Sequence, residues 1–296
     1  MIDWQNKIAV VTGGGSGIGE AMAHRFAREG MALIVADIDM EAAGRVAAAI
    51  ETAGGTALAA RADVARQDDL DALAELAWSH FGSADLVCAN AGVVPAGRHR
   101  PVWDYPLEDW TWSLDVNLMG VVHTIRAFIP RMIAEGRPGH FVTTASVAGL
   151  VSGPGSAVYS TAKHGAVRVT EALYASLREK GLPIGVTLLC PGLVNTRIYQ
   201  SERSRPSTLQ PQAGIVEETP ELQAIADELY RNALSPEAVA DQLFGAIQEG
   251  RLYAVTSQNY DGAIRERTEA MLSRRNPEFP GLLALSKADS PAREPK

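Results

Sequence analysis

Short apolar runs alternate with longer amphipathic segments along most of the chain. Runs of strand length cover residues 7–11, 32–36, 84–89, 140–145 and 184–190, with a weaker run at 56–64. Between them, segments with a helical period cover residues 17–28, 40–52, 67–81, 107–134 and 156–180. The runs lack regular polar alternation, which is typical of strands whose sheet is covered by helices on both faces. The pattern therefore predicts an α/β fold with a doubly wound parallel sheet.

The alternation breaks down after Pro191. Residues 195–235 mix polar and apolar positions, and only 219–234 have a helical period. We expect residues 1–258 to form a single domain that includes this irregular segment.

The chain returns to regular elements after this segment. Ser235-Pro236-Glu237 is typical of a helix start, with a capping serine and a proline in the first turn. This helix should end near Gly250 and lead into a strand at 252–255. We expect a C-terminal extension over 259–296, with a helix at 261–274 and a disordered end at 285–296, where proline and charged residues prevail.

Composition narrows the possible partners. The 296 residues are 46% hydrophobic and carry a net charge of −8, with pI ≈ 5.3. An acidic chain is a poor match for nucleic acid or an anionic membrane, so neither is expected as a partner. No apolar run reaches the length of a membrane-spanning helix and no secretion signal is evident, so we expect a cytoplasmic protein.

Cysteine and histidine usage does not favour a metal site. Cys88 and Cys190 each lie at the end of an apolar run, and the six histidines have no metal-binding spacing. We expect no disulfide framework and no metal.

A glycine-rich turn follows the first strand. Gly13, Gly17 and Gly19 give the spacing G-x-x-x-G-x-G. This is not the G-x-G-x-x-G pattern, because position 18 is isoleucine. Such glycines allow a tight turn and let a pyrophosphate approach a helix N-terminus. A plain strand–helix connection would also tolerate them, so the turn alone is weak evidence.

Asp37 strengthens the interpretation of this turn. It lies at the end of the second strand, 20 residues after Gly17 (37 − 17). A carboxylate there suits the ribose 2′-hydroxyl of NAD and repels the 2′-phosphate of NADP. Ile38 and Ser16 supply no basic group to offset that charge, so NAD is expected and NADP is less favoured. The alternative is a solvated loop carboxylate.

Tyr159 and Lys163 are four residues apart in the predicted helix 156–180 and therefore share a face. An ordinary amphipathic pair, with the ring in the core and the ammonium in water, would have the same spacing.

Together these features resemble the short-chain dehydrogenase/reductase family over about residues 6–255. The family motif T-G-x-x-x-G-x-G matches Thr12 to Gly19, and its Tyr-x-x-x-Lys matches Tyr159 and Lys163. Further matches, in order, are Asp63-Val64, Asn90-Ala91-Gly92, Asn117, Ser146, and Pro191-Gly192 with Thr196. Departures are Cys88-Ala89 before Asn90, a long segment at 93–106, and the chain beyond residue 255.

The resemblance implies a Rossmann fold and a catalytic set of Asn117, Ser146, Tyr159 and Lys163. Tyr159 would be the acid/base, and the Lys163 cation would lower its pKa and also bind the nicotinamide ribose. Ser146 would bind the substrate oxygen, and Asn117 would hold a water in a proton relay. The implied NAD contacts are Gly13, Gly15, Ser16, Gly17, Ile18, Gly19, Asp37, Ile38, Asp63, Val64, Asn90, Ala91, Gly92, Tyr159, Lys163, Pro191, Gly192, Val194 and Thr196.

The substrate is less well indicated. Val94, Ala148, Leu193 and Tyr199 are the candidate contacts, and they predict a bulky, mostly apolar secondary alcohol or ketone. Arg98, Arg100, Arg203 and Arg205 leave a carboxylate or CoA substrate open. The alternatives are a 3-oxoacyl (CoA or carrier) reductase, a steroid or sugar/diol dehydrogenase, or a catalytically silent nucleotide-binding protein. The resemblance also implies a lid over the substrate at about residues 193–235, and a homodimer or homotetramer.

Overall fold

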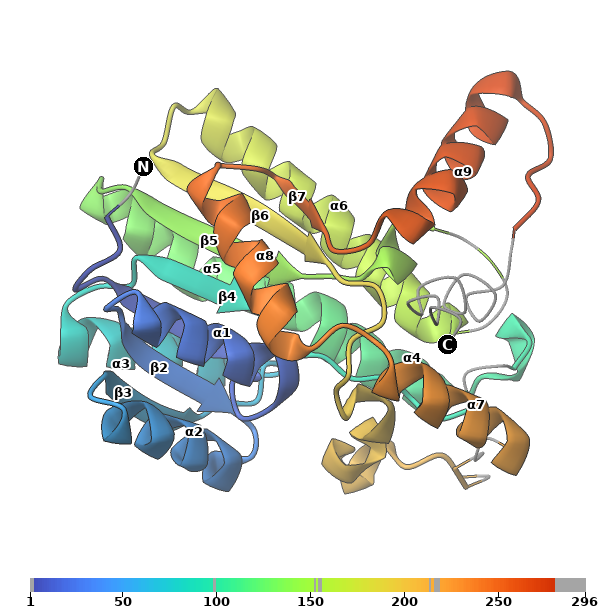
Figure 1. Cartoon of the computed structure of the whole chain (residues 1–296), viewed down its shortest axis with the longest axis horizontal. Coiled ribbons are helices and arrows are strands. Elements are labelled where there is room, and N and C mark those ends of the chain that lie inside the picture. Colours follow the sequence, from blue (N-terminus) through green and yellow to red (C-terminus); the bar gives the residue numbers. More distant parts are fainter. Residues whose placement is uncertain are drawn as a thin grey trace, which may run out of the picture.

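Seven parallel strands form the centre of the molecule (Figure 1). The computed structural model describes residues 3–97, 100–151, 153, 156–212, 214–215 and 219–279. The strand order is β3-β2-β1-β4-β5-β6-β7, so the chain runs outward from β1 in both directions. The strands are β1 (Ile8–Thr12), β2 (Ala32–Asp37), β3 (Thr56–Arg61), β4 (Leu86–Ala89), β5 (Gly139–Thr144), β6 (Ile184–Cys190) and β7 (Tyr253–Val255). The predicted doubly wound α/β fold is confirmed.

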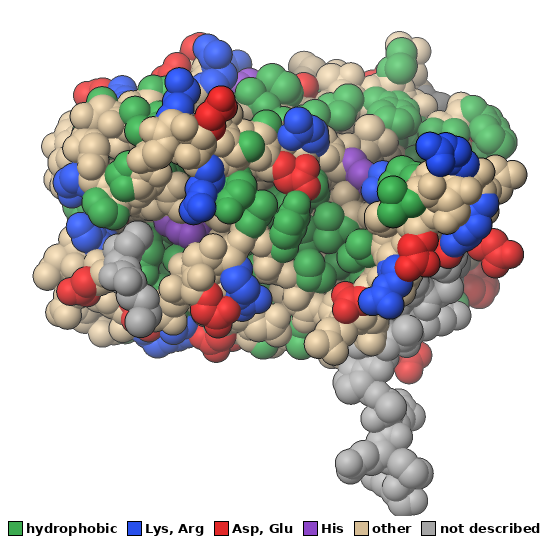
Figure 2. Space-filling model, turned by 90° about the horizontal axis from the view of Figure 1, so that it is seen from above, with side chains coloured by type: hydrophobic (Ala, Val, Ile, Leu, Met, Phe, Trp, Pro, Cys, Tyr) green, Lys and Arg blue, Asp and Glu red, His purple; other side chains and the backbone are tan. Residues whose placement is uncertain are grey.

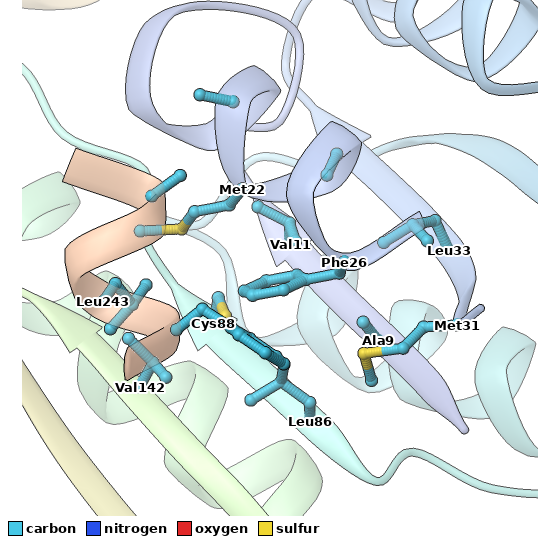
Figure 3. Packing of buried hydrophobic residues seen from close by; sticks show 14 of the residues in the cluster. Ala9, Val11, Met22, Phe26, Met31, Leu33, Leu86, Cys88, Val142 and Leu243 are labelled. Carbon is cyan, nitrogen blue, oxygen red and sulfur yellow. The ribbon is translucent and has the colours of Figure 1, made fainter. Parts of the chain in front are cut away.

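Helices cover both faces of this sheet. One face carries α1 (Gly17–Arg28), α2 (Met40–Thr52) and α8 (Pro236–Gln248), and the other carries α3 (Gln67–Phe81), α5 (Gly120–Glu135) and α6 (Ala157–Glu179). Figure 3 shows the first layer, where Phe26 of α1 and Leu243 of α8 pack over strand residues such as Val11 and Cys88. Ser235 caps α8, because its Oγ accepts a hydrogen bond from the Ala238 amide at 3.1 Å. Burial of both sheet faces explains why the strands show no polar alternation.

One predicted helix is divided in two. The expected segment 107–134 consists of α4 (Leu107–Leu114), a π-helical turn (Asp115–Met119) and α5. In this turn, Asn117 Nδ2 donates to the Ser113 carbonyl oxygen at 3.1 Å. A side chain that takes a helical carbonyl competes with the backbone ladder, and single π turns are frequent at functional sites.

The last part of the chain adds α7 (Pro220–Arg231) and α9 (Asp261–Ser273). Helix α9 projects away from the body (Figure 1), with Met271 and Leu272 largely exposed. Just before it, Tyr260 is buried and packs with Val147 and Val151. The expected disordered end at 285–296 lies outside the described residues.

Cys88 and Cys190 are free and buried, and burial raises the pKa of both thiols. Within the described ranges, no helix has the length and apolar character needed to cross a membrane.

Candidate active site

A cavity of about 770 Å³ opens at the carboxyl ends of the strands. In open parallel sheets, ligands bind at this edge, where the strand order reverses on either side of β1 and β4. The glycine turn after β1, helix α6, the segment after β6 and Tyr260 all line this cavity. A dinucleotide and a second small molecule would therefore meet in one space.

The backbone of the glycine turn approaches its neighbours too closely for side chains. Gly13 has φ +63°, and a Cβ on it would lie 2.8 Å from Ala91 Cα. A Cβ on Gly19 would lie 2.1 Å from the Gly13 carbonyl oxygen. Ser16, Gly17 and Ile18 line the cavity with them. The helix that follows directs its first amides into the cavity, where they suit a phosphate.

The Asp37 carboxylate is fixed rather than solvated. Its Oδ2 accepts from the Gly15 amide at 2.9 Å, and its Oδ1 accepts from the Asp39 amide at 3.0 Å. Asp37 and Ile38 line the cavity, whereas Gly15 does not. Gly15 instead supports the Asp37 carboxylate through its amide. It must be glycine, because a Cβ there would lie 2.9 Å from the Asp37 oxygen.

Two further motifs border the same cavity. Asp63 and Val64 lie on its wall, and Asp63 Oδ1 accepts from the Ala65 amide at 3.0 Å. Asn90 follows β4 and contacts the ends of the strands on either side of it. Its Nδ2 donates to the Thr12 carbonyl oxygen of β1 at 3.0 Å, and its Oδ1 accepts from Thr144 Oγ1 of β5 at 3.0 Å. This connection holds the ends of β1 and β5 beside β4. Other predicted cofactor residues on the wall are Ala91, Gly92, Pro191, Gly192, Val194 and Thr196.

Three of the four predicted catalytic residues meet on one wall. Tyr159 and Lys163 come from α6, and Ser146 follows β5. Lys163 Nζ donates to the Thr144 carbonyl oxygen at 2.8 Å and lies 5.7 Å from the centre of the Tyr159 ring. Ser146 Oγ accepts from the Ala148 amide at 3.1 Å, which sets the hydroxyl toward Tyr159. The amphipathic-pair alternative does not hold, because Lys163 is buried.

The expected lowering of the Tyr159 pKa by Lys163 is not what the structure gives. Burial raises the pKa of Tyr159, and the hydrogen bond with Ser146 offsets part of that rise. Burial also lowers the pKa of Lys163 to about 8. Desolvation disfavours the charged form of each group.

Asn117 lies behind the wall rather than on it. It is fully buried, and its side chain accepts from the Val93 amide at 3.1 Å and donates to the Val93 carbonyl oxygen at 2.9 Å. A Cβ on Gly92 would lie 2.9 Å from Asn117 Oδ1 and 3.3 Å from Lys163 Nζ. Gly92 therefore lets the two side chains approach each other, and the amide fixes the strand-end loop beside Lys163.

The substrate end differs from the prediction in one residue. Val94, Ala148 and Leu193 line the cavity, but Tyr199 does not. The Tyr199 ring stacks instead on Tyr230, with the ring centres 4.8 Å apart, and Tyr230 forms the wall. The spacing of residues along the sequence cannot show which of two stacked rings faces the cavity.

Other wall residues were missed at the sequence level: Trp112, Leu229, Tyr230 and Tyr260. Three of them carry the helical spacing of ordinary core positions, and Tyr260 follows the last strand. Arg203 and Arg205 also line the cavity, whereas Arg98 lies outside the described residues.

Comparisons with known proteins agree with this geometry. The sequence profile of the short chain dehydrogenase family matches residues 7–207. A 1-deoxy-11-beta-hydroxypentalenate dehydrogenase of Streptomyces exfoliatus is 42% identical over 197 residues, 66% of this chain and 70% of that protein. A cyclohexanol dehydrogenase of Acinetobacter sp. (strain SE19) is 36% identical over 193 residues, 65% of this chain and 75% of that protein.

A solved structure extends the similarity to nearly the whole chain. A short chain dehydrogenase/reductase of Burkholderia phymatum, in complex with NAD, is 38% identical with a TM-score of 0.87. The match covers 95% of this chain and 99% of that one. With the family profile spanning the glycine turn, Ser146, Tyr159 and Lys163, the chain belongs to the short-chain dehydrogenase family of oxidoreductases.

Proposed function

We propose that this protein is an NAD-dependent oxidoreductase that interconverts a bulky, mostly apolar secondary alcohol and its ketone. The observation that carries the proposal is the meeting of Ser146, Tyr159 and Lys163 on one wall of the cavity that begins at the glycine turn. A hydroxyl, a phenol and a buried amine are the groups needed to hold and move one proton at a carbonyl or carbinol oxygen.

The cofactor end fits NAD. Gly13 and Gly19 leave no space for side chains, so the backbone at these two positions can approach a pyrophosphate closely. Asp37 presents a fixed carboxylate, which suits a free ribose 2′-hydroxyl and repels a 2′-phosphate. When bound, NAD accepts hydride from the carbinol carbon or returns it to the carbonyl carbon. The Burkholderia phymatum relative that contains NAD supports the same choice here.

The chain's own residues would then manage the proton. The Tyr159 hydroxyl donates a proton to the carbonyl oxygen during reduction and accepts it back during oxidation. Ser146 donates a hydrogen bond to the same oxygen, and that bond strengthens as negative charge develops. Lys163 places a positive charge beside the phenol and is held in place by the Thr144 carbonyl.

The substrate end is mainly apolar. Val94, Leu193 and Leu229 line it together with aromatic rings. The relatives named for hydroxypentalenate and for cyclohexanol support an alicyclic alcohol as the substrate.

We also propose that the protein is cytoplasmic and forms a homodimer or homotetramer. Figure 2 shows hydrophobic side chains gathered in the middle of the face on which α6 and β7 lie.

The test is NADH formation with cyclohexanol, 1-phenylethanol and borneol, with NADP in parallel. We expect turnover mainly with NAD. Tyr159→Phe should lower kcat by about 10²- to 10⁴-fold, because the proton has no donor or acceptor. NADH binding, followed by fluorescence, should stay within about twofold.

The matched control is Tyr174→Phe, on the same helix but outside the cavity. It should keep full activity. Full activity in Tyr159→Phe would refute the mechanism. Tight NADH binding with no turnover of any alcohol would favour the nucleotide-binding protein instead.

A further inference from the structure

Four charged side chains form a cluster at the substrate end, and two of them are fully buried. Asp109 of α4 and Arg205 have side chains that are each 1% exposed, and Arg205 Nη2 lies 2.7 Å from Asp109 Oδ1. Arg100 Nη2 approaches Asp109 Oδ2 at 3.3 Å. Glu202 accepts from Arg205 Nε at 2.6 Å and from Nη2 at 2.9 Å. Burying a charged side chain costs free energy unless it is paired with an opposite charge. A buried pair with this many partners therefore suggests a structural role.

This cluster joins segments that are distant in sequence. Asp109 and Arg205 are 96 residues apart. Two backbone contacts reinforce the join: the Ala96 amide donates to Glu202 Oε1 at 2.9 Å, and the Val94 amide donates to Ser201 Oγ at 3.1 Å. The 3-10 turn Ile198–Ser204 is thereby tied both to α4 and to the loop after β4.

Arg205 also belongs to the cavity wall. Its guanidinium lies 4.2 Å above the centre of the Trp112 ring, and both residues line the cavity. The Leu209 carbonyl oxygen accepts from Arg205 Nη1 at 3.0 Å. Four of the five N–H groups of a guanidinium are therefore used inside the protein.

The cluster is balanced in charge. Two guanidinium groups face two carboxylates, and every carboxylate lies within 3.3 Å of a guanidinium nitrogen. A receptor for a substrate carboxylate needs an arginine whose paired N–H groups face the ligand. Arg205 directs its paired donors toward Asp109 and Glu202 instead.

We propose that Arg205 is a positioning residue. Held by Asp109 and Glu202, it locks residues 198–209 into the wall of the substrate pocket, and these carboxylates cancel its charge, so that Arg205 does not attract a carboxylate-bearing substrate in preference to an uncharged alcohol. The proposal rests on the proposed function for its substrate. It also accounts for the long segment 93–106, which supplies Arg100.

The test compares Arg205→Met, Arg205→Lys and Asp109→Asn with Arg131→Met as a matched control. Arg131 also pairs with a carboxylate, at 3.0 Å from Glu75, and lies over a tryptophan, Trp78, but at the surface. The probes are cyclohexanol and 4-hydroxycyclohexanecarboxylate, an uncharged and an anionic ring of similar size. Hydrogen exchange of residues 198–209 gives a measurement independent of turnover.

For Arg205→Met we expect the KM of cyclohexanol to rise about tenfold or more, with a much smaller change in kcat and an unchanged Kd for NADH. Hydrogen exchange at 198–209 should speed up by about tenfold or more. Arg205→Lys should rescue both effects in part, because it keeps the charge but loses the fork. Asp109→Asn should reduce the preference for cyclohexanol over the anion, and Arg131→Met should change nothing.

Two results would overturn the proposal. One is unchanged exchange and an unchanged cyclohexanol KM in Arg205→Met. The other is a wild-type preference for the anion that Arg205→Met abolishes, because Arg205 would then be a carboxylate receptor. If Arg205→Met does not fold, Arg205→Lys and Asp109→Asn decide. If the wild type oxidises no alcohol, the proposed function fails, and the exchange measurements alone decide whether Arg205 holds the wall.

Discussion

Burial shifts the protonation of two neighbouring side chains in opposite directions at the site. The pKa of the Tyr159 phenol is raised and that of the Lys163 amine is lowered to about 8. At neutral pH the phenol is therefore protonated and the amine still carries its charge. This state is ready to donate a proton, which favours the reduction of a ketone.

The pH dependence should differ between the two directions. In the proposed oxidation Tyr159 must act as the tyrosinate, so kcat/KM for cyclohexanol should rise with pH, by up to about tenfold per unit between about pH 6 and pH 8, where the Lys163 amine keeps its charge. Reduction of cyclohexanone needs the phenol and should not rise over the same range. Initial rates with saturating NAD or NADH measure both. An oxidation rate that is flat across this range would contradict the raised pKa.

His140 should make the fold sensitive to acid. It is buried in β5, its Nε2 lies 2.9 Å from Thr187 Oγ1, and burial lowers its pKa from 6.5 to about 4. Below pH 6.5 the unfolded chain binds a proton that the folded chain does not. The free energy of unfolding should therefore fall from about pH 6.5 to about pH 4, by roughly 3 kcal/mol in total, and level off below.

Urea unfolding at pH 7 and pH 4.5 measures this loss. His140→Gln should reduce the difference between the two pH values, whereas the exposed His80→Gln should leave it as in the wild type. An equal loss in wild type and His140→Gln would assign the acid sensitivity to other groups.

At the scale of elements, the strands and most helices follow from the sequence. Apolar runs such as 184–190 are long enough to identify, and Ser235-Pro236 marks a helix start. The division of 107–134 does not follow, because α4 and α5 keep an apolar face on either side of the π turn. That turn depends on contacts of Asn117 with Val93, which is 24 residues away.

The candidate site was predictable to a similar degree. Tyr159 and Lys163 have a spacing that signals a shared helix face, and the glycine turn has its own pattern. Tyr230, Tyr260 and Arg205 could not be assigned, because their partners are distant in sequence and each has an ordinary spacing. The raised pKa of Tyr159 was missed because the sequence shows the nearby cation but not the depth of burial.

Asn117→Ala should show whether Asn117 stabilises the loop after β4 or takes part in the reaction. It would leave the Val93 amide and carbonyl without their side-chain partners, so the free energy of unfolding should fall by about 2–4 kcal/mol. Urea unfolding measures the loss, and Gln242→Ala, at an exposed position of α8, is a control that should change it little. If kcat falls while stability is unchanged, Asn117 acts in the reaction rather than in holding the loop.

At the scale of the whole molecule, the cofactor would bridge elements from both sides of the sheet. A ligand that binds only the folded state stabilises it, by about 2.7 kcal/mol at 100 times its Kd. NADH should therefore raise Tm, and NADPH at the same concentration should raise it much less because of Asp37. Asp37→Asn should narrow the gap, measured by thermal unfolding. An equal shift with both cofactors in the wild type would contradict the role of Asp37.

The residues that α7 and the segment before α9 contribute to the cavity wall affect how the substrate range can change during evolution. All four predicted catalytic residues lie at or before Lys163, whereas Leu229, Tyr230 and Tyr260 shape the far wall from the last third of the chain. Under the proposed function, mutations that accumulate there would change which alcohol fits and spare the groups assigned to proton transfer. Selection can then broaden or exchange the substrates of such a lineage while the reaction itself is inherited intact.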